Sequence, residues 1–186
     1  MQVHFQVDKL PTFINPVLTI GAFDGVHAGH QAILNSLKDE ALRVKGETVV
    51  VTFHPHPRRI LHNADAPSLL TTLDERIERF QLLGIDHLVV VPFDHVFAEL
   101  SAREYVKKFL VDHFQPKIIV IGYDHRFGKD RTGDFELLKT MSSEHQFEVF
   151  EIPEQLLNES SVSSTSIRAS LLNGQVENAN KLLTYK

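Results

Sequence analysis

The sequence has 186 residues, of which 42% are hydrophobic and 23% charged, with a formal net charge of −5. This composition favours one globular domain and excludes an intrinsically disordered chain, and the negative charge argues against general nucleic-acid binding. The chain has no cysteine, which excludes disulfide and thiolate chemistry. Residues 1–8 lack the segments of a signal peptide, and no apolar run approaches the roughly 18 residues of a membrane span. We therefore expect a cytoplasmic protein with no membrane and no nucleic-acid partner.

Apolar runs typical of strands alternate with amphipathic segments typical of helices along the chain. Strands are predicted at the start of residues 1–16 and over 17–21, 48–53, 87–92, 117–122 and 147–152. Helices are predicted from the glycine-rich turn to Gly46 and over 72–84, 101–110, 133–144, 163–174 and 176–183, and residues 58–71 are predicted to be an irregular loop.

This alternation predicts an α/β fold, a Rossmann-like doubly wound parallel sheet of about five strands. Ligands of such sheets bind beyond the carboxyl ends of the strands. Unusual polar clusters follow three of the predicted strands, at residues 21–30, 54–57 and 123–131. We expect all three clusters at one edge of the sheet, where they would form a site.

The glycine-rich stretch 21–30 lies between a strand and a helix. Its glycines let backbone N–H groups approach an anion, and the N-terminus of the following helix adds positive potential. His27 and His30 share one side of that helix start and can stabilise charge that develops on phosphorus. The pattern predicts a triphosphate site, where an acceptor attacks the α-phosphate and pyrophosphate leaves; the alternative is two surface histidines. Asp24 is the nearest carboxylate for Mg²⁺, or else it bonds its own turn.

The serine-rich stretch 162–168 begins another predicted helix. Hydroxyl and backbone N–H groups at a helix start can hold phosphate oxygens, and Arg168, one turn further on, can add a bidentate contact. Taken alone, this stretch is better explained as an ordinary serine N-cap with a solvated arginine. Paired with the histidine motif, it favours a phosphate site.

Two further stretches follow strands. Residues 121–134 combine glycines, aromatic residues and basic residues, which suits a loop that closes over an aromatic, phosphorylated ligand; the alternative is a solvated charged loop. Residues 50–58 contain His54-Pro55-His56-Pro57, whose prolines stop the strand and form a rigid wall against a flat ring. A metal site of His54, His56, His27 and His30 is less favoured, because no acidic residue is apparent nearby.

Together these four stretches, in this order and spacing, resemble the FMN adenylyltransferase module of bacterial bifunctional riboflavin kinase/FAD synthetases, in the nucleotidyltransferase superfamily. Residues 27–30 match the superfamily's His-x-Gly-His motif, and residues 163–168 match its Ser-Ser/Thr-Thr-x-x-Arg signature. Phe93 and residues 96–101 match the family's Phe-x-x-x-Phe-Ala-x-Leu-Ser segment. The resemblance covers nearly the whole chain.

The resemblance implies transfer of AMP from Mg-ATP to FMN, which gives FAD and pyrophosphate. It implies catalytic roles for His27, His30 and Arg168. ATP binding is implied for Gly21, Phe23, Asp24, Gly25, Gly29, Ser164 and Thr165. Flavin binding is implied for Phe53, His54, Pro55, His56, Pro57, Asp124, Arg126 and Phe127. Mg²⁺ would be held mostly by phosphate oxygens and water, so no protein metal ligand is assigned.

The sequence departs from the family pattern in two places. His125 replaces an aromatic residue of the family's Asp-Phe-Arg-Phe-Gly segment, and the riboflavin kinase barrel that follows in the family is absent. We expect residues 1–186 to form the adenylyltransferase domain, with 175–186 as a C-terminal helix and tail that would lead to the kinase domain.

Four alternatives stay open at this point. The first is a related nucleotidyltransferase that uses phosphopantetheine, nicotinamide mononucleotide or CTP. The second is a non-catalytic nucleotide or flavin sensor that has kept the fold. The third is a histidine-based metal hydrolase, and the last is a fragment of an aminoacyl-tRNA synthetase, which shares the His-x-Gly-His motif.

Overall fold

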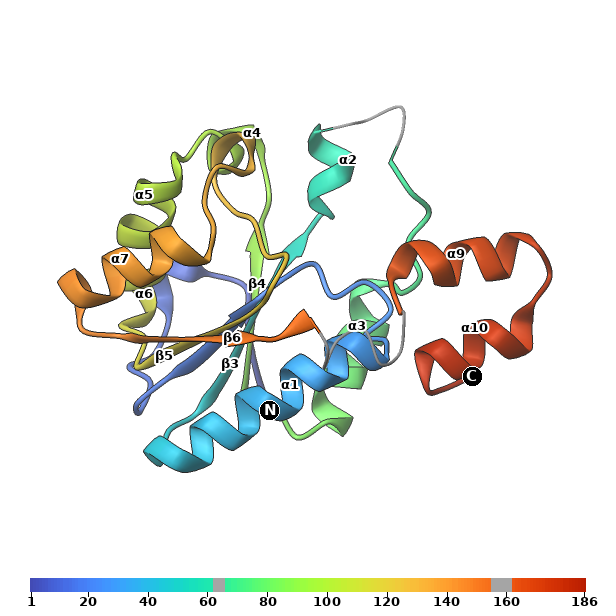
Figure 1. The fold of residues 1–186 in the computed structure, drawn as a ribbon, viewed down its shortest axis with the longest axis horizontal. Coiled ribbons are helices and arrows are strands. Elements are labelled where there is room, and N and C mark those ends of the chain that lie inside the picture. Colours follow the sequence, from blue (N-terminus) through green and yellow to red (C-terminus); the bar gives the residue numbers. More distant parts are fainter. Residues whose placement is uncertain (62–65, 155–161) are drawn as a thin grey trace.

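The computed structural model describes residues 1–61, 66–154 and 162–186. Six parallel strands form one sheet in the order β1-β4-β3-β2-β5-β6 (Figure 1). The strands are β1 (Gln2–His4), β2 (Val17–Ile20), β3 (Thr48–His54), β4 (His87–Pro92), β5 (Ile118–Gly122) and β6 (Glu148–Ile152). The predicted doubly wound α/β fold is confirmed. The sheet has one strand more than the five expected, because the short N-terminal strand pairs with β4 at the edge.

Helices and helical turns connect the strands and follow the last of them. They are η1 (Val7–Lys9), α1 (Ala28–Val44), α2 (Pro57–Leu61), α3 (Leu73–Leu82), α4 (His95–Ala98), α5 (Ala102–Glu104), the π-helical η3 (Tyr105–Val111), α6 (Asp112–Phe114), η4 (Lys129–Arg131), α7 (Phe135–His145), α9 (Ser164–Leu172) and α10 (Val176–Leu183).

Local sequence signals explain where several helices begin. Thr72 and Ser101 each start a capping box, with Glu75 and Glu104 reaching back to them, as the sequence predicts. The irregular loop predicted for residues 58–71 is wrong in part, because Pro57–Leu61 is helical. Proline at the first helical position has its φ already set for a helix, so Pro57, the second proline after β3, starts α2.

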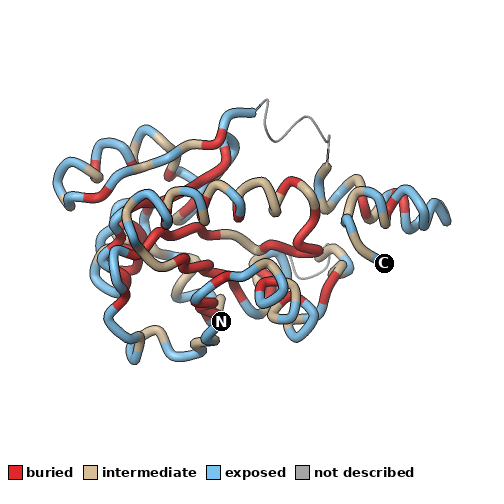
Figure 2. Tube along the Cα trace, turned by 90° about the horizontal axis from the view of Figure 1, so that it is seen from below, coloured by how far each residue is buried: buried red, intermediate tan, exposed pale blue. Residues whose placement is uncertain are grey.

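Both faces of the sheet are covered, as the unbroken apolar run of β3 predicts. Successive strand residues point to opposite faces, so Val17 and Val50 pack with α1 and α3 on one side, while Leu18 and Val51 pack with the helices between β4 and β5 and with α7 on the other. Figure 2 shows the buried residues concentrated along the strands, with exposed residues on the outer helices.

The order of the strands reverses between β2 and β5. These two strands are neighbours in the sheet, although β3, β4 and several helices lie between them in sequence. The glycine-rich turn follows β2, the proline-rich turn follows β3, and residues 123–131 follow β5. All three clusters therefore leave the carboxyl edge of the sheet, at its topological switch point. In the described ranges, no helix is long and apolar enough to cross a membrane.

Candidate active site

Two neighbouring cavities lie at this edge of the sheet. The first, called here the histidine cavity, has a volume of about 610 Å³ and is lined by His27, Gly29, His30, Ile33, His56, Arg58, Pro67, Tyr123, Asp124, Val162, Ser163, Ser164, Thr165 and Arg168. The second, called here the aromatic cavity, has a volume of about 690 Å³. Asp124 lines both cavities, so a ligand in one can meet a ligand in the other.

The two histidines of the first motif sit at the start of α1 with their rings stacked. The ring centroids are 3.7 Å apart and the planes differ by 18°. Nδ1 of His27 accepts a hydrogen bond of 3.4 Å from the backbone N–H of His30. In neutral His27 the proton is therefore assigned to Nε2, which leaves that atom as the donor for a ligand.

Burial keeps both imidazoles uncharged at neutral pH. It lowers the pKa of His27 to about 4, while Asp24 raises this pKa and Arg168 lowers it by smaller amounts. Burial also holds the pKa of His30 well below its usual value, with His27 acting in the same direction. A buried, neutral histidine pair gains a large stabilisation of its protonated form when negative charge arrives beside it, which suits a site for a polyanion.

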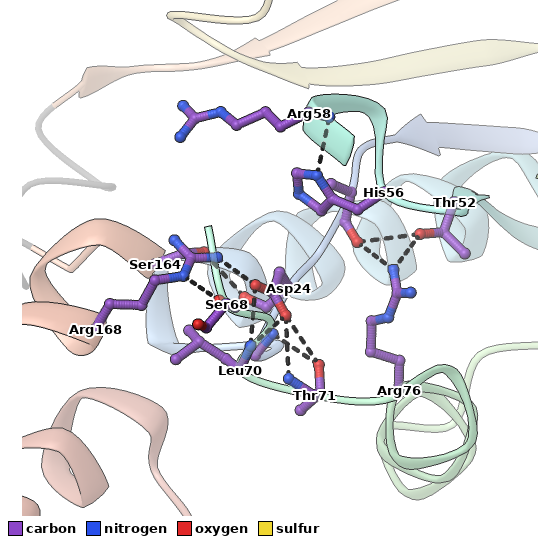
Figure 3. A network of polar contacts seen from close by, with 12 residues as sticks. Asp24, Thr52, His56, Arg58, Ser68, Leu70, Thr71, Arg76, Ser164 and Arg168 are labelled. Atoms are coloured by element: carbon purple, nitrogen blue, oxygen red, sulfur yellow. Dashed lines mark hydrogen bonds and ion pairs between the residues drawn. The ribbon is translucent and has the colours of Figure 1, made fainter. Parts of the chain in front are cut away.

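Asp24 is the centre of a polar network that joins three separate segments (Figure 3). Its carboxylate is 3% exposed. It accepts hydrogen bonds from the backbone N–H groups of Leu70 and Thr71, at 2.9 and 3.1 Å, and forms an ion pair with Arg168. Arg168 also donates from Nε to the carbonyl of Ser68 at 2.6 Å. The network therefore fixes the guanidinium of α9 against the glycine-rich turn.

The glycine-rich turn also forms hydrogen bonds with residues of α9 and α3. The hydroxyl of Ser164 donates to the backbone carbonyl of Asp24 at 2.9 Å. Arg76 of α3, which is 1% exposed, donates from Nη1 to the carbonyl of Ala22 at 2.7 Å and to the hydroxyl of Thr52 at 3.2 Å. In the part of the chain that the structure describes, no carboxylate forms an ion pair with Arg76, and Asp24, which acts on it electrostatically, already pairs with Arg168. The buried guanidinium therefore adds positive potential beside the turn.

The aromatic cavity has a different lining. Phe53, Phe93, Phe97, Tyr105 and Phe127 all contribute to it. These rings meet mainly edge to face, as Phe53 and Phe93 do at 5.5 Å and 81°, and Tyr105 stacks on Phe127 at 5.2 Å and 27°. Such mutual packing holds the rings in place and gives the cavity an aromatic wall.

A basic rim borders the aromatic rings. It is formed by residues 126–131, which include Arg126, Lys129 and Arg131. Arg126 pairs with Asp134 at 3.0 Å and Lys129 pairs with Glu99 at 2.5 Å. Gly128 has φ +71°, and a Cβ there would lie 2.6 Å from the Cα of Ala102, so this turn can only be closed by glycine.

Comparison with known proteins assigns the chain to a family. The family model for FAD synthetase matches residues 11–166. The chain belongs to the FAD synthetase family. The resemblance predicted from the motifs is therefore confirmed.

Relatives of this family match over most of the chain. A "Bifunctional riboflavin kinase/FMN adenylyltransferase" of Buchnera aphidicola subsp. Schizaphis graminum is 39% identical over 170 residues, which cover 91% of this chain and 54% of the relative. The protein of the same name from Escherichia coli K12 is 36% identical over 169 residues, with the same coverage of 91% and 54%. This FAD synthetase chain thus spans about half the length of the curated relatives it matches.

Solved structures support the same fold. A structure described as a macrolide-efflux protein from Streptococcus pneumoniae superposes with a TM-score of 0.80 at 28% identity, covering 99% of this chain and 60% of that one. A pantoate-beta-alanine ligase from Francisella tularensis superposes with a TM-score of 0.55 at 13% identity, covering 91% of this chain and 76% of the other; this likeness concerns the fold alone.

Most of the residues implied by the family resemblance line one of the two cavities. The histidine cavity receives His27, Gly29, His30, Ser164, Thr165 and Arg168. The aromatic cavity receives Gly21, Phe53, Pro57, Arg126 and Phe127, and both cavities share Asp124.

Seven of the expected site residues lie elsewhere or on the other side. Gly21, expected to bind ATP, lines the aromatic cavity and not the histidine cavity. His56, expected on the flavin side, lines the histidine cavity. Phe23 is 3% exposed and packs against His30 and Phe80 in the core, while Asp24 and Gly25 are buried in the turn. His54 is exposed, and neither it nor Pro55 lines these two cavities.

Several residues of the site were given no individual role from the sequence. Tyr123 and Arg58 line the histidine cavity, and Thr71 and Arg76 support the turn. The capping box at Thr72 places Thr71 and Arg76 beside a helix start, but only the tertiary structure shows that this start faces the glycine-rich turn. Among the residues that the structure describes, no group of three or more histidine or acidic side chains is arranged to hold a metal ion.

Proposed function

We propose that this chain transfers AMP from ATP to FMN and so forms FAD and pyrophosphate. One observation carries the proposal: a polar cavity with a histidine pair and a cavity lined by aromatic rings adjoin and share Asp124. The first suits a triphosphate and the second a flat ring system. Membership of the FAD synthetase family supports the same pair of substrates.

In the proposed reaction, a phosphate oxygen of FMN attacks the α-phosphorus of ATP. The new P–O bond forms as the bond from the α-phosphorus to the bridging oxygen breaks, and pyrophosphate leaves with that electron pair. Such transfers need in-line positioning and stabilisation of charge rather than a covalent intermediate with the protein. His27 and His30 would donate hydrogen bonds to the α-phosphate as its charge develops.

The start of α9 would hold the β- and γ-phosphates. Ser164, Thr165 and Arg168 line the histidine cavity there, and the N-terminus of the helix adds positive potential. Asp24 and Ser68 fix the guanidinium of Arg168 before any ligand arrives, so little ordering entropy is lost when the phosphates bind.

The aromatic cavity would hold the isoalloxazine ring of FMN. Phe53, Pro57 and Phe127 provide apolar and aromatic walls, while Arg126 lies on the basic rim. Asp124 lies between the two cavities, where the phosphate of FMN would approach ATP. His56 we assign to the nucleotide side, because it lines the histidine cavity.

Mg²⁺ would accompany ATP and neutralise phosphate charge in this reaction. Asp24 does not fit the role of its ligand, because the carboxylate is buried and occupied by Leu70, Thr71 and Arg168. The ion would therefore be held mostly by phosphate oxygens and water, as is common for Mg²⁺.

The proposal is tested by measuring pyrophosphate release and FAD formation from Mg-ATP with FMN and without it. We expect one pyrophosphate per FAD, and release that depends on FMN. The same chain should not phosphorylate riboflavin, because we assign only the adenylyltransferase activity to residues 1–186. ATP binding without FMN-dependent pyrophosphate release would contradict the proposal and favour a nucleotide sensor. Release that depends on phosphopantetheine or nicotinamide mononucleotide instead would favour a related transferase.

A further inference from the structure

The C-terminal segment 183–185 lies directly on the glycine-rich turn. The hydroxyl of Tyr185 donates a hydrogen bond of 2.6 Å to the backbone carbonyl of Gly25. Neither this segment nor the helix α10 before it falls within residues 11–166, which the family model matches. One partner of this contact therefore lies outside the part of the chain that the family model matches.

A second contact joins the same segment to the helix that carries the histidines. Nε2 of Gln31 donates to the hydroxyl of Thr184 at 2.6 Å and to the carbonyl of Val26 at 3.0 Å. Gln31 directly follows His30 in α1. One amide group thus ties the tail to both the turn and the first turn of α1.

Tyr185 is itself held in place from α3. The guanidinium carbon of Arg79 lies 3.7 Å from the centroid of the tyrosine ring, a cation–π contact. Burial raises the pKa of Tyr185 above its usual value, so its hydroxyl stays protonated. The phenol is therefore a fixed donor aimed at the turn.

The turn needs such support because its backbone is strained. Val26, a β-branched residue, has φ +36°, and Gly25 before it has φ +84°. A β-branched residue in this region is a genuine outlier, which persists only when the surroundings over-determine it. The N–H of Gly25 is held by the hydroxyl of Thr71 at 3.0 Å, and its carbonyl is held by Tyr185.

Close packing reinforces the hydrogen bonds. A Cβ added at Gly25 would lie 2.8 Å from Cδ1 of Leu70 and 3.2 Å from Cδ2 of Leu183. The loop before α3 and the C-terminal segment thus both pack against the turn. The residue after Val26 is His27, the N-cap of α1, so the position of the histidine pair depends on the conformation of this turn.

We propose that Tyr185 is a positioning residue for adenylyl transfer, which acts through Gly25 and Val26 on the placement of His27 and His30. The inference rests on the proposed function. Tyr185 lines neither the histidine cavity nor the aromatic cavity, so it has no contact with the substrates through which to act. Its effect should therefore appear in turnover rather than in flavin affinity.

The test compares Tyr185→Phe, Thr184→Ala and Leu172→Ala with the unmodified chain. Tyr185→Phe keeps the ring on Arg79 and removes only the hydroxyl, so the fold should persist. Leu172 is 87% exposed at the other end of the same pair of helices and serves as the control. For Tyr185→Phe we expect kcat for FAD formation to fall by about tenfold, and Kd for FMN and the thermal midpoint to stay close to those of Leu172→Ala. Thr184→Ala should shift kcat in the same direction by less.

An unchanged kcat in Tyr185→Phe overturns the inference. So does a loss of kcat in which Kd for FMN rises and the thermal midpoint falls as well, because the tyrosine would then only stabilise the fold. If the unmodified chain forms no FAD at all, it is the proposed function that fails, which keeps the two failures distinct.

Discussion

The histidine cavity and the aromatic cavity adjoin at the carboxyl edge of one sheet, yet their walls are held in place by different forces. The histidine cavity is built on buried charge: Asp24, Arg168 and Arg76 are all largely enclosed and linked through backbone groups of the turn and of residues 68–71. The aromatic cavity is built on rings that pack against one another, and its charged groups lie on an exposed rim.

With the proposed substrates, this difference would let one site treat ATP and FMN differently. A network of buried hydrogen bonds and ion pairs fixes the orientation of its side chains, because each bond requires its donor and acceptor to be aligned. Packed aromatic side chains define the width of a binding slot, but they allow a bound ring to slide within its own plane. Catalytic alignment should therefore depend on the histidine cavity, and flavin affinity on the aromatic cavity. Substitutions in each cavity should separate the two effects.

The largest effect is expected at the histidine pair. His30→Ala, and separately His27→Ala, should lower kcat for FAD formation by roughly 10²-fold or more, the loss typical for removing a preorganised donor to a charged transition state. Kd for FMN should stay within about twofold of the unmodified value, since neither ring lines the aromatic cavity. The measurements are steady-state kinetics and flavin fluorescence titration. Equal losses of kcat and of FMN affinity would show that the two cavities do not have separate roles.

The next largest effect concerns Asp24 and Arg168. Arg168→Ala should weaken ATP binding by about 10- to 100-fold, as expected for the loss of charge-assisted bonds to phosphate. Asp24→Asn should weaken it too, because the guanidinium loses the partner that fixes its direction. Titration calorimetry with ATP measures both constants.

A double-mutant cycle decides whether Asp24 acts through Arg168. In the Arg168→Ala background, Asp24→Asn should cost little further ATP affinity, which gives a coupling free energy of about 1–3 kcal/mol. Additive losses would mean that Asp24 serves only to hold Leu70 and Thr71. Ile33→Val, a small change on the same cavity wall, is the control for general disturbance.

A smaller effect is expected at the aromatic cavity. Phe127→Leu keeps an apolar side chain but removes the ring that stacks on Tyr105, so Kd for FMN should rise by about 3- to 10-fold. The ATP affinity should not change, which calorimetry with ATP checks. A matched loss of ATP affinity would contradict the division of labour between the two cavities.

The smallest effect is a dependence of stability on pH. The pKa of His27 is about 4 in the folded protein, against an ordinary value of 6.5. Because this folded pKa is depressed, the unfolded chain binds more protons between these values, so stability should fall as pH drops from about 6.5 towards 4. At pH 5.5 the loss should be about 1 kcal/mol for this histidine.

His125 should add to the same pH dependence, because burial lowers its pKa also to about 4. Urea unfolding at pH 7.5 and pH 5.5 measures the difference. His125→Phe, which places an aromatic ring there, should reduce the pH dependence. A slope that stays unchanged in this variant would show that His125 is as exposed to protons in the folded state as in the unfolded state.

The sequence predicts much of the fold because its signals are local. The alternating apolar runs mark five strands of the sheet and its two-sided burial, and the capping boxes at Thr72 and Ser101 mark helix starts. The strand of Gln2–His4 is too short for its pattern to place it in the sheet, and its pairing with β4 comes from tertiary contact. Pro57–Leu61 forms a helix that begins at a proline and that no apolar periodicity predicts.

The candidate site was predictable where a motif carries its own chemistry. His27, His30 and Ser164 meet in one cavity as expected. The partners of Asp24 and the position of Tyr185 were not predictable, because they join segments that lie far apart in sequence, as in the bond from Arg168 to Asp24 or from Tyr185 to Gly25. The sequence predicts that the glycine-rich turn and residues 163–168 share one site, but it does not indicate the bond between Arg168 and Asp24 or any contact of Tyr185 with Gly25.

The central claim is that the two cavities form one reaction centre in which the phosphate of FMN attacks the α-phosphorus of ATP directly. The stereochemical outcome at that phosphorus tests it, using a single diastereomer of ATP with sulfur on the α-phosphate and FMN as the acceptor. A single in-line displacement inverts the configuration, and inversion in the sulfur-containing FAD is the result we predict. Retention would require two successive displacements and would contradict direct transfer between the cavities.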